Sequence, residues 1–153
     1  MCKKYQVLPE DNFIFYTYNG LLTTAPKSFV GLSERDRADL YNGCGAGRIG
    51  GKLTPESLLG LKITYLCQIH DHMYERCCCE RDEEIADGIF VMNMNNWISG
   101  HSSNVATALS RFTLMSKYMY GVSTTIYSRE YWEINRREIG RDSRYTGIYS
   151  LEL

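Results

Sequence analysis

The chain has 153 residues, the size of one ordinary domain, and its 44% hydrophobic content is too high for a disordered polypeptide. With 17 Lys and Arg against 18 Asp and Glu, the formal net charge is −1, which argues against a dedicated nucleic-acid-binding protein. No apolar run approaches the roughly 18–20 residues of a membrane span, so no transmembrane segment is predicted. The sequence contains no repeats, low-complexity stretches or linkers, and we expect residues 1–153 to form a single domain.

The N-terminal segment has two lysines but no apolar stretch of about 7–15 residues, because Asp11 and Asn12 interrupt it. We therefore expect no signal peptide in this chain, and the compartment stays open between the cell interior, export by another route, and removal of a leader. The six cysteines are Cys2, Cys44, Cys67, Cys77, Cys78 and Cys79. Without a secretory signal, composition alone favours free thiols over disulfide bridges.

The first forty residues look irregular, with short ordered pieces. Residues 13–18 are β-branched and aromatic and are followed by Asn19-Gly20, which predicts a strand and a tight turn. Residues 33–40 are charged and predict one or two helical turns. Residues 41–51 hold five of the chain's thirteen glycines, so they predict a loop with unusual backbone conformations.

Helices dominate the prediction for the rest of the chain. Thr54-Pro55-Glu56 has the composition of a helix start, and Gly60 would end that short helix. Apolar residues then recur at helical spacing over residues 63–77, from about residue 82 to Gly100, and from residue 105 to Gly121. We leave residues 127–153, which mix Tyr with five Arg, without an assignment. The expected fold class is mostly α.

Two of these helices carry candidate catalytic groups. His70 belongs to the apolar stripe of the first long helix, and a histidine there is more often a core residue than a catalyst. Asp87 lies on the same face of the second helix as Phe90, Met94 and Trp97, where an unpaired carboxylate is costly to bury. If Asp87 paired with one nitrogen of His70, the other nitrogen would be free to act as a base. Equally, Asp87 could simply stabilise the positive end of its helix.

A metal site is a further possibility. Asp71 and the glycine-rich residues 43–47 together offer a carboxylate and backbone carbonyls, the oxygen ligands that Ca²⁺ prefers. The same loop could cradle an anion, although it lacks the Lys and Ser or Thr of a phosphate-binding loop. A zinc site built from His70, His72 and the cysteine run is disfavoured, because residues two apart on a helix face different ways.

Residues 41–47 (YNGCGAG) and 67–74 (CQIHDHMY) together resemble the signature pair of the phospholipase A2 superfamily, a calcium loop followed by a C-x-x-H-D-x-x-Y helix. Residues 86–90 (ADGIF) are similar to the segment in which the second helix supplies the supporting Asp, and the overall pattern is closest to the compact bacterial-type members. The likeness spans about residues 41–98, with a fainter likeness to about 132. It implies a core of two antiparallel long helices plus further helices.

With this resemblance the chain divides into an irregular or short-β N-terminal extension (1–40), a phospholipase A2-like core (41–132) and a tail (133–153). The resemblance implies that His70 is the general base for water attacking the sn-2 ester of a phospholipid. It further implies that Asp87 fixes the imidazole tautomer and that Tyr74 hydrogen-bonds Asp87. An alternative is a catalytically weak or inactive member that serves as a binding module through its Tyr- and Arg-rich tail.

The resemblance also implies the cofactor Ca²⁺, with Asp71 and the carbonyls of Gly43, Gly45 and Gly47 as its ligands. It pairs Cys44 with Cys67 in a disulfide that ties the loop to the catalytic helix, which would indicate an exported protein; without the bridge a cytoplasmic one is expected. The expected partner is a phospholipid or a membrane surface. The oligomeric state, the lipid preference and the role of Cys77, Cys78 and Cys79 are left open.

Overall fold

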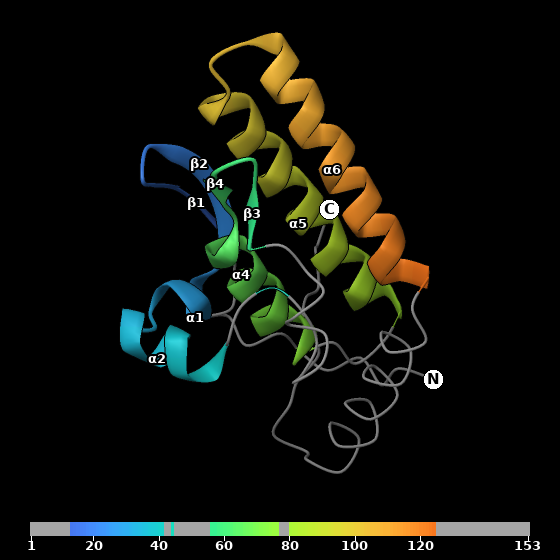
Figure 1. Cartoon of the computed structure of the whole chain (residues 1–153). Helices are drawn as coiled ribbons and strands as arrows, with labels where there is room; N and C mark the ends of the chain where they lie inside the picture. Colours follow the sequence, from blue (N-terminus) through green and yellow to red (C-terminus); the bar gives the residue numbers. More distant parts are fainter. Residues whose placement is uncertain (1–12, 42–43, 45–55, 77–79, 125–153) are drawn as a thin grey trace.

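The computed structural model describes residues 13–41, 44, 56–76 and 80–124 (Figure 1). Helices make up most of this part of the chain, and a short antiparallel hairpin lies near its N-terminal end. The predicted mostly α fold with a short-β N-terminal region is therefore confirmed at this level. None of the described helices is both long enough and apolar enough to cross a membrane.

The N-terminal hairpin consists of β1 (Phe13–Tyr18) and β2 (Leu21–Pro26), which pair antiparallel. Asn19 and Gly20 connect the strands with φ angles of 50° and 79°, the left-handed conformation that a two-residue hairpin turn requires. The strand and tight turn predicted from the sequence are confirmed.

Two short helices follow the hairpin, α1 (Lys27–Val30) and α2 (Glu34–Leu40). Ser33 caps α2, because its hydroxyl accepts a hydrogen bond from the backbone N–H of Asp36 at 3.1 Å. The helical turns predicted over residues 33–40 are confirmed.

The helix predicted to start at residues 54–56 and end at Gly60 is wrong; its first two residues lie outside the described part of the chain. Instead, β3 (Ser57–Leu58) and β4 (Leu61–Lys62) form a small antiparallel ladder. Leu59 and Gly60 both have positive φ, 47° and 82°, so they form the turn of a second hairpin.

A buried arginine holds the turn of this second hairpin. Arg111 is 6% exposed and donates hydrogen bonds to the carbonyls of Leu58 at 3.1 Å and Leu59 at 2.9 Å. The same guanidinium donates to the carbonyl of His101 and to the hydroxyl of Ser102, both at 3.1 Å. These hydrogen bonds satisfy the two carbonyls at the turn and tie the second hairpin to α6.

Three longer helices complete the described chain: α4 (Thr64–Tyr74), α5 (Glu80–His101) and α6 (Val105–Thr124). In Figure 1, α5 and α6 run side by side, and α5 packs against both α4 and strand β2 of the first hairpin. All three were predicted, with different ends. The first stops at Tyr74 rather than continuing to Cys77, and the other two continue past Gly100 and Gly121.

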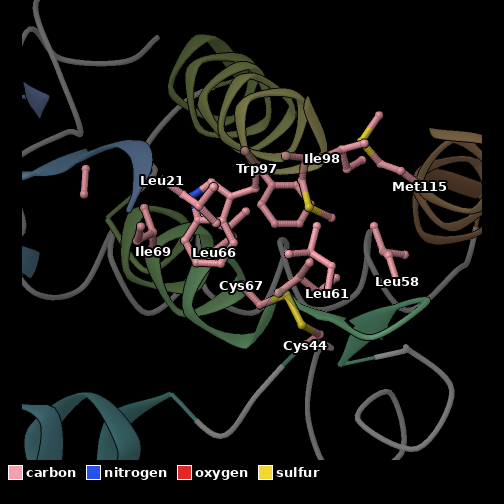
Figure 2. Close-up of a cluster of buried hydrophobic side chains, with 14 of the residues drawn as sticks. Leu21, Cys44, Leu58, Leu61, Leu66, Cys67, Ile69, Trp97, Ile98 and Met115 are labelled. Carbon is pink, nitrogen blue, oxygen red and sulfur yellow. A yellow bond between two sulfur atoms is a disulfide. The ribbon is translucent and has the colours of Figure 1, made fainter. Parts of the chain in front are cut away.

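The hydrophobic core lies where α4, α5 and both hairpins meet. Figure 2 shows Leu66 and Ile69 of α4 beside Trp97 and Ile98 of α5, with Leu21 of β2 at one end. Further core side chains come from β3, β4 and α6: Leu58, Leu61 and Met115.

Hydrogen bonds fix the outer edge of β2 against α5. The side-chain amide of Asn93 accepts from the N–H of Thr24 at 2.8 Å and donates to its carbonyl at 2.7 Å. One helical turn later, the indole N–H of Trp97 donates to the hydroxyl of Thr23 at 2.9 Å. Asn93 and both threonines are buried, so these polar groups depend on one another.

The two neighbouring threonines give a matched test of this packing. Thr23 uses its hydroxyl twice, whereas Oγ1 of Thr24 is buried without a hydrogen-bond partner in the described structure. We expect Thr23→Val to lower the free energy of unfolding by about 1–3 kcal/mol, and Thr24→Val to leave it unchanged or raise it slightly. Urea denaturation of both variants measures the difference, and equal losses would contradict this assignment of partners.

Candidate functional site

The imidazole of His70 and the carboxylate of Asp87 meet where α4 faces α5. Nε2 of His70 lies 2.7 Å from Oδ1 of Asp87. The two side chains are 20% and 44% exposed, so the pair lies at the surface of the core rather than inside it. Of the two alternatives for Asp87, the contact with His70 is the one that the structure contains.

Two aromatic rings hold the imidazole in place. Tyr74 lies one turn along α4 from His70, with ring centroids 4.5 Å apart, and the Phe90 ring of α5 lies 4.8 Å away. Among the described residues no group hydrogen-bonds the second ring nitrogen, Nδ1, of His70. The side chain therefore has one nitrogen bound to a carboxylate and the other available for proton transfer, which is the arrangement of a general base.

The next residue along α4, Asp71, is partly buried. The pKa of its carboxyl is raised to about 7, chiefly by burial; His70 lowers this pKa and the charge of Glu75, one turn later, raises it. In the part of the chain that the structure describes, the Asp71 carboxylate has neither a hydrogen-bond donor nor an ion-pair partner. A partly buried carboxylate without a partner is unfavourable, so the position suits a cation.

Helix α6 also reaches this region, although the sequence analysis assigned no site residue to it. Burial and the negative charge of Asp71 raise the pKa of Tyr118 to about 12. Tyr118 lies in the region of fainter likeness to the compact bacterial-type members, but no role was predicted for its side chain. Only the packing of α6 against the core brings its phenol close to Asp71.

The glycine-rich loop is described only at Tyr41 and Cys44, and the three predicted carbonyl ligands, Gly43, Gly45 and Gly47, lie outside the described residues. Cys44 forms a disulfide bond with Cys67 of α4, with Cα atoms 5.0 Å apart (Figure 2). The pairing that the resemblance implies is therefore present, and the expectation of free thiols from composition is wrong for these two residues. The other four cysteines, Cys2, Cys77, Cys78 and Cys79, lie outside the described part of the chain.

A second histidine, His72, is the buried one. It is 1% exposed, whereas His70, which the apolar stripe placed in the core, is 20% exposed. Nδ1 of His72 lies 2.7 Å from the hydroxyl of Tyr41, and Nε2 lies 2.9 Å from the hydroxyl of Ser28. Burial, with a contribution from the charge of Arg76, lowers the pKa of His72 to about 3, so the ring is neutral.

No zinc site forms around these histidines in the described structure. Both nitrogens of His72 are engaged by hydroxyl groups, and no three side chains of His, Cys, Asp or Glu within the described ranges could hold a metal ion together. A calcium site with one carboxylate and several backbone carbonyls needs no such group. Of the predicted calcium ligands, the structure describes only Asp71.

Comparisons with known proteins gave no match: no family model, no curated protein and no solved structure is significantly similar to this chain. The likeness to the phospholipase A2 superfamily therefore depends on the sequence motifs alone, chiefly residues 41–47, 67–74 and 86–90.

Proposed function

We propose that this chain is a calcium-dependent esterase that hydrolyses the sn-2 ester of phospholipids, in the manner of phospholipase A2. The observation that carries the proposal is the 2.7 Å contact between Nε2 of His70 and Oδ1 of Asp87. The pair is partly exposed, so water and a substrate can approach it. Asp71 next to it is a carboxylate that lacks a cationic partner among the described residues.

The dyad supports a water-activating mechanism. An ionised carboxylate only accepts hydrogen bonds, so Asp87 requires the proton of His70 on Nε2 and leaves the lone pair of Nδ1 free. Nδ1 then takes a proton from water as the water oxygen attacks the ester carbonyl, and Asp87 stabilises the resulting imidazolium. The same proton passes to the departing lysophospholipid oxygen when the tetrahedral intermediate collapses.

The proposed metal site lies on the neighbouring face of α4. A bound calcium ion would supply a Lewis acid for the negative charge that develops on the carbonyl oxygen. Asp71 would hold it, together with the predicted carbonyl ligands of Gly43, Gly45 and Gly47. Asp71 directly follows His70 on the helix, so the general base and the cation site are positioned by the same turn.

The test is hydrolysis of an sn-2-labelled phospholipid by the full chain, in excess Ca²⁺ and in excess EGTA. We expect label release with calcium, none with EGTA, and a loss of about 10²–10⁴-fold in His70→Ala. Release that survives the chelator or the substitution would contradict the mechanism. Absence of turnover in a folded wild-type protein would overturn the proposal and favour the non-catalytic binding module.

The variant Asp71→Asn tests the contribution of the metal ligand independently of the general base, because it removes one charge and keeps the side-chain shape. We expect this variant to lose calcium binding and calcium-dependent turnover. In EGTA at pH 8 it should unfold at a higher temperature than wild type, because a partly buried carboxylate without a partner is replaced by a neutral amide. An Asp71→Asn variant that still responds to calcium would exclude Asp71 as the ligand.

A further inference from the structure

A pocket of about 240 Å³ lies between the tip of the first hairpin, α2 and the start of α4. Its lining residues all belong to the described part of the chain and include Tyr18, Arg37, Lys62, Tyr65, Gln68 and Trp97. Successive residues of a helix turn by ~100°, so His70 lies ~140° around α4 from Tyr65 and ~160° from Gln68. The pocket is therefore on the side of α4 opposite the His70–Asp87 pair and is separate from it.

One wall of the pocket is aromatic. The rings of Tyr18 in β1 and Tyr65 in α4 are stacked, with centroids 3.6 Å apart and an interplanar angle of 3°. Trp97 of α5 lies nearly parallel to both rings, with its centroid 6.1 Å from that of Tyr18 and 6.3 Å from that of Tyr65. Side chains from three elements thus fix one another, and they form the kind of apolar surface that is usual in a small-molecule site.

Arg37 supplies a positive charge in a fixed position. Its Nη1 donates a hydrogen bond to the carbonyl of Leu32 at 2.7 Å, and its Cζ lies 5.4 Å from the centre of the Tyr65 ring. Among the described residues no carboxylate forms an ion pair with this guanidinium, and its Nε and Nη2 have no hydrogen-bond acceptor. These two neighbouring donors form a fork that matches the two oxygens of a carboxylate.

The other charged groups at the pocket are Lys62 and Glu34. Lys62 of β4 adds a second positive charge, and Glu34, three residues before Arg37 in α2, adds a negative one. Both of these side chains are exposed, so water screens their charges more than that of the half-buried Arg37. The remaining polar residues of the lining are neutral: Asn19, Thr64 and Gln68. With two positive charges against one negative charge, the pocket favours a ligand that carries one negative charge.

The volume of the pocket limits the ligand to a small molecule. An apolar cavity of about 150 Å³ accommodates benzene. At about 240 Å³, the pocket has room for one such ring and a carboxylate group. We propose that it binds a small aromatic carboxylate. The carboxylate pairs with Arg37 and Lys62, and the ring contacts the aromatic wall. This binding goes beyond the proposed esterase and does not depend on it, because it uses no residue of the dyad or of the proposed calcium site.

The test is titration of the full chain with sodium benzoate, followed by NMR. We expect saturable binding with a dissociation constant of about 1 mM or below. Benzamide, which has the same shape without the charge, and inorganic phosphate, which has charge without the ring, should each bind at least about tenfold more weakly. Absence of saturation with benzoate, or equal binding of either comparison compound, would overturn the proposal.

The indole N–H resonance of Trp97 locates the bound ligand. The sequence contains two tryptophans, so the variant Trp132→Phe leaves Trp97 as the source of the remaining indole signal. We expect this signal to shift in step with saturation by benzoate, because Trp97 lines the pocket. Saturable binding that leaves the signal unchanged would place the ligand elsewhere and contradict the proposal.

Three substitutions test the charges. Arg37→Gln is expected to raise the benzoate dissociation constant about tenfold, and Lys62→Gln about threefold, since the exposed lysine is more strongly screened. Glu34→Gln is expected to lower it about twofold, because a repelling charge is removed. Arg37→Gln also loses the bond to the Leu32 carbonyl, so its melting temperature is measured as a check on folding. Lys62→Gln keeps the test decisive if Arg37→Gln does not fold.

Arg35→Gln is the matched control. It removes one positive charge from the same helix as Arg37→Gln, but the Arg35 side chain is 90% exposed, pairs with Asp39 at 3.7 Å and does not line the pocket. Its benzoate affinity should equal that of wild type. Equal weakening in Arg35→Gln and Lys62→Gln would show an effect of overall charge and overturn the proposed site, while leaving the proposed esterase function untouched.

Discussion

Replacing Asp87 with Asn is expected to reduce kcat by about 10⁴-fold while leaving the fold intact. An Asn side chain can donate a hydrogen bond to Nε2 of His70, which moves the ring proton to Nδ1 and removes the lone pair that must accept a proton from water. The Asp87 side chain is 44% exposed, so the substitution has little effect on packing. The measurement is kcat at saturating calcium, with the melting temperature as a check on folding.

Asp87→Ala is the informative comparison. Without any side-chain partner the imidazole exchanges between its two tautomers in contact with water, so a fraction of His70 keeps a basic Nδ1. We expect a loss of about 10²-fold, smaller than the loss in the Asn variant. Full activity in Asp87→Asn would show that the contact between His70 and Asp87 is structural only.

Removing the Cys44–Cys67 disulfide is expected to cost about 3 kcal/mol of folding free energy, from the loss of a crosslink that closes a loop with a sequence separation of 23. The reason is that the unfolded chain gains conformational freedom when the crosslink is absent. The measurement is urea denaturation of wild type and of the double variant Cys44→Ala/Cys67→Ala, each with and without dithiothreitol.

Reduction of the wild type and the double variant remove the same disulfide, so each serves as a control for the other. Reduced wild type should unfold at the same urea concentration as the double variant, and dithiothreitol should not shift the double variant. A loss below about 1 kcal/mol would mean that the hydrogen bonds of Tyr41 hold the loop without the disulfide. A shift of the double variant by dithiothreitol would point to a second bridge among the remaining cysteines.

The sequence predicted those elements whose signals are local. Asn19-Gly20 favours a two-residue hairpin turn by itself, and the apolar stripes of the three long helices need no distant partner to be recognised. The prediction of a helix before Gly60 was wrong because the structure there depends on a distant residue. Its start signals are local, but the conformation of Leu59 and Gly60 depends on a guanidinium from Arg111, 52 residues further along the chain.

The difference between local and distant signals also explains why the burial of the two histidines was predicted wrongly. The spacing of apolar residues placed His70 in the core, yet His72 is the buried one, because α4 is covered on a second face by α1 and Tyr41. His70 and Asp87 were found because they belong to a recognisable motif. The bonds of His72 to Ser28 and Tyr41 join residues 44 and 31 positions apart, and no pattern in the sequence marks them.

The contact between Asn93 and Thr24 bears on the smallest part of this chain that can fold on its own. A fragment starting at residue 41, where the motifs begin, would leave the Asn93 amide and the Trp97 indole N–H without their partners on β2. Each such group left inside an apolar surface costs about 1–3 kcal/mol, a large share of the stability of a small domain. The unit that folds therefore includes residues 13–26, although the chemistry is carried by α4 and α5.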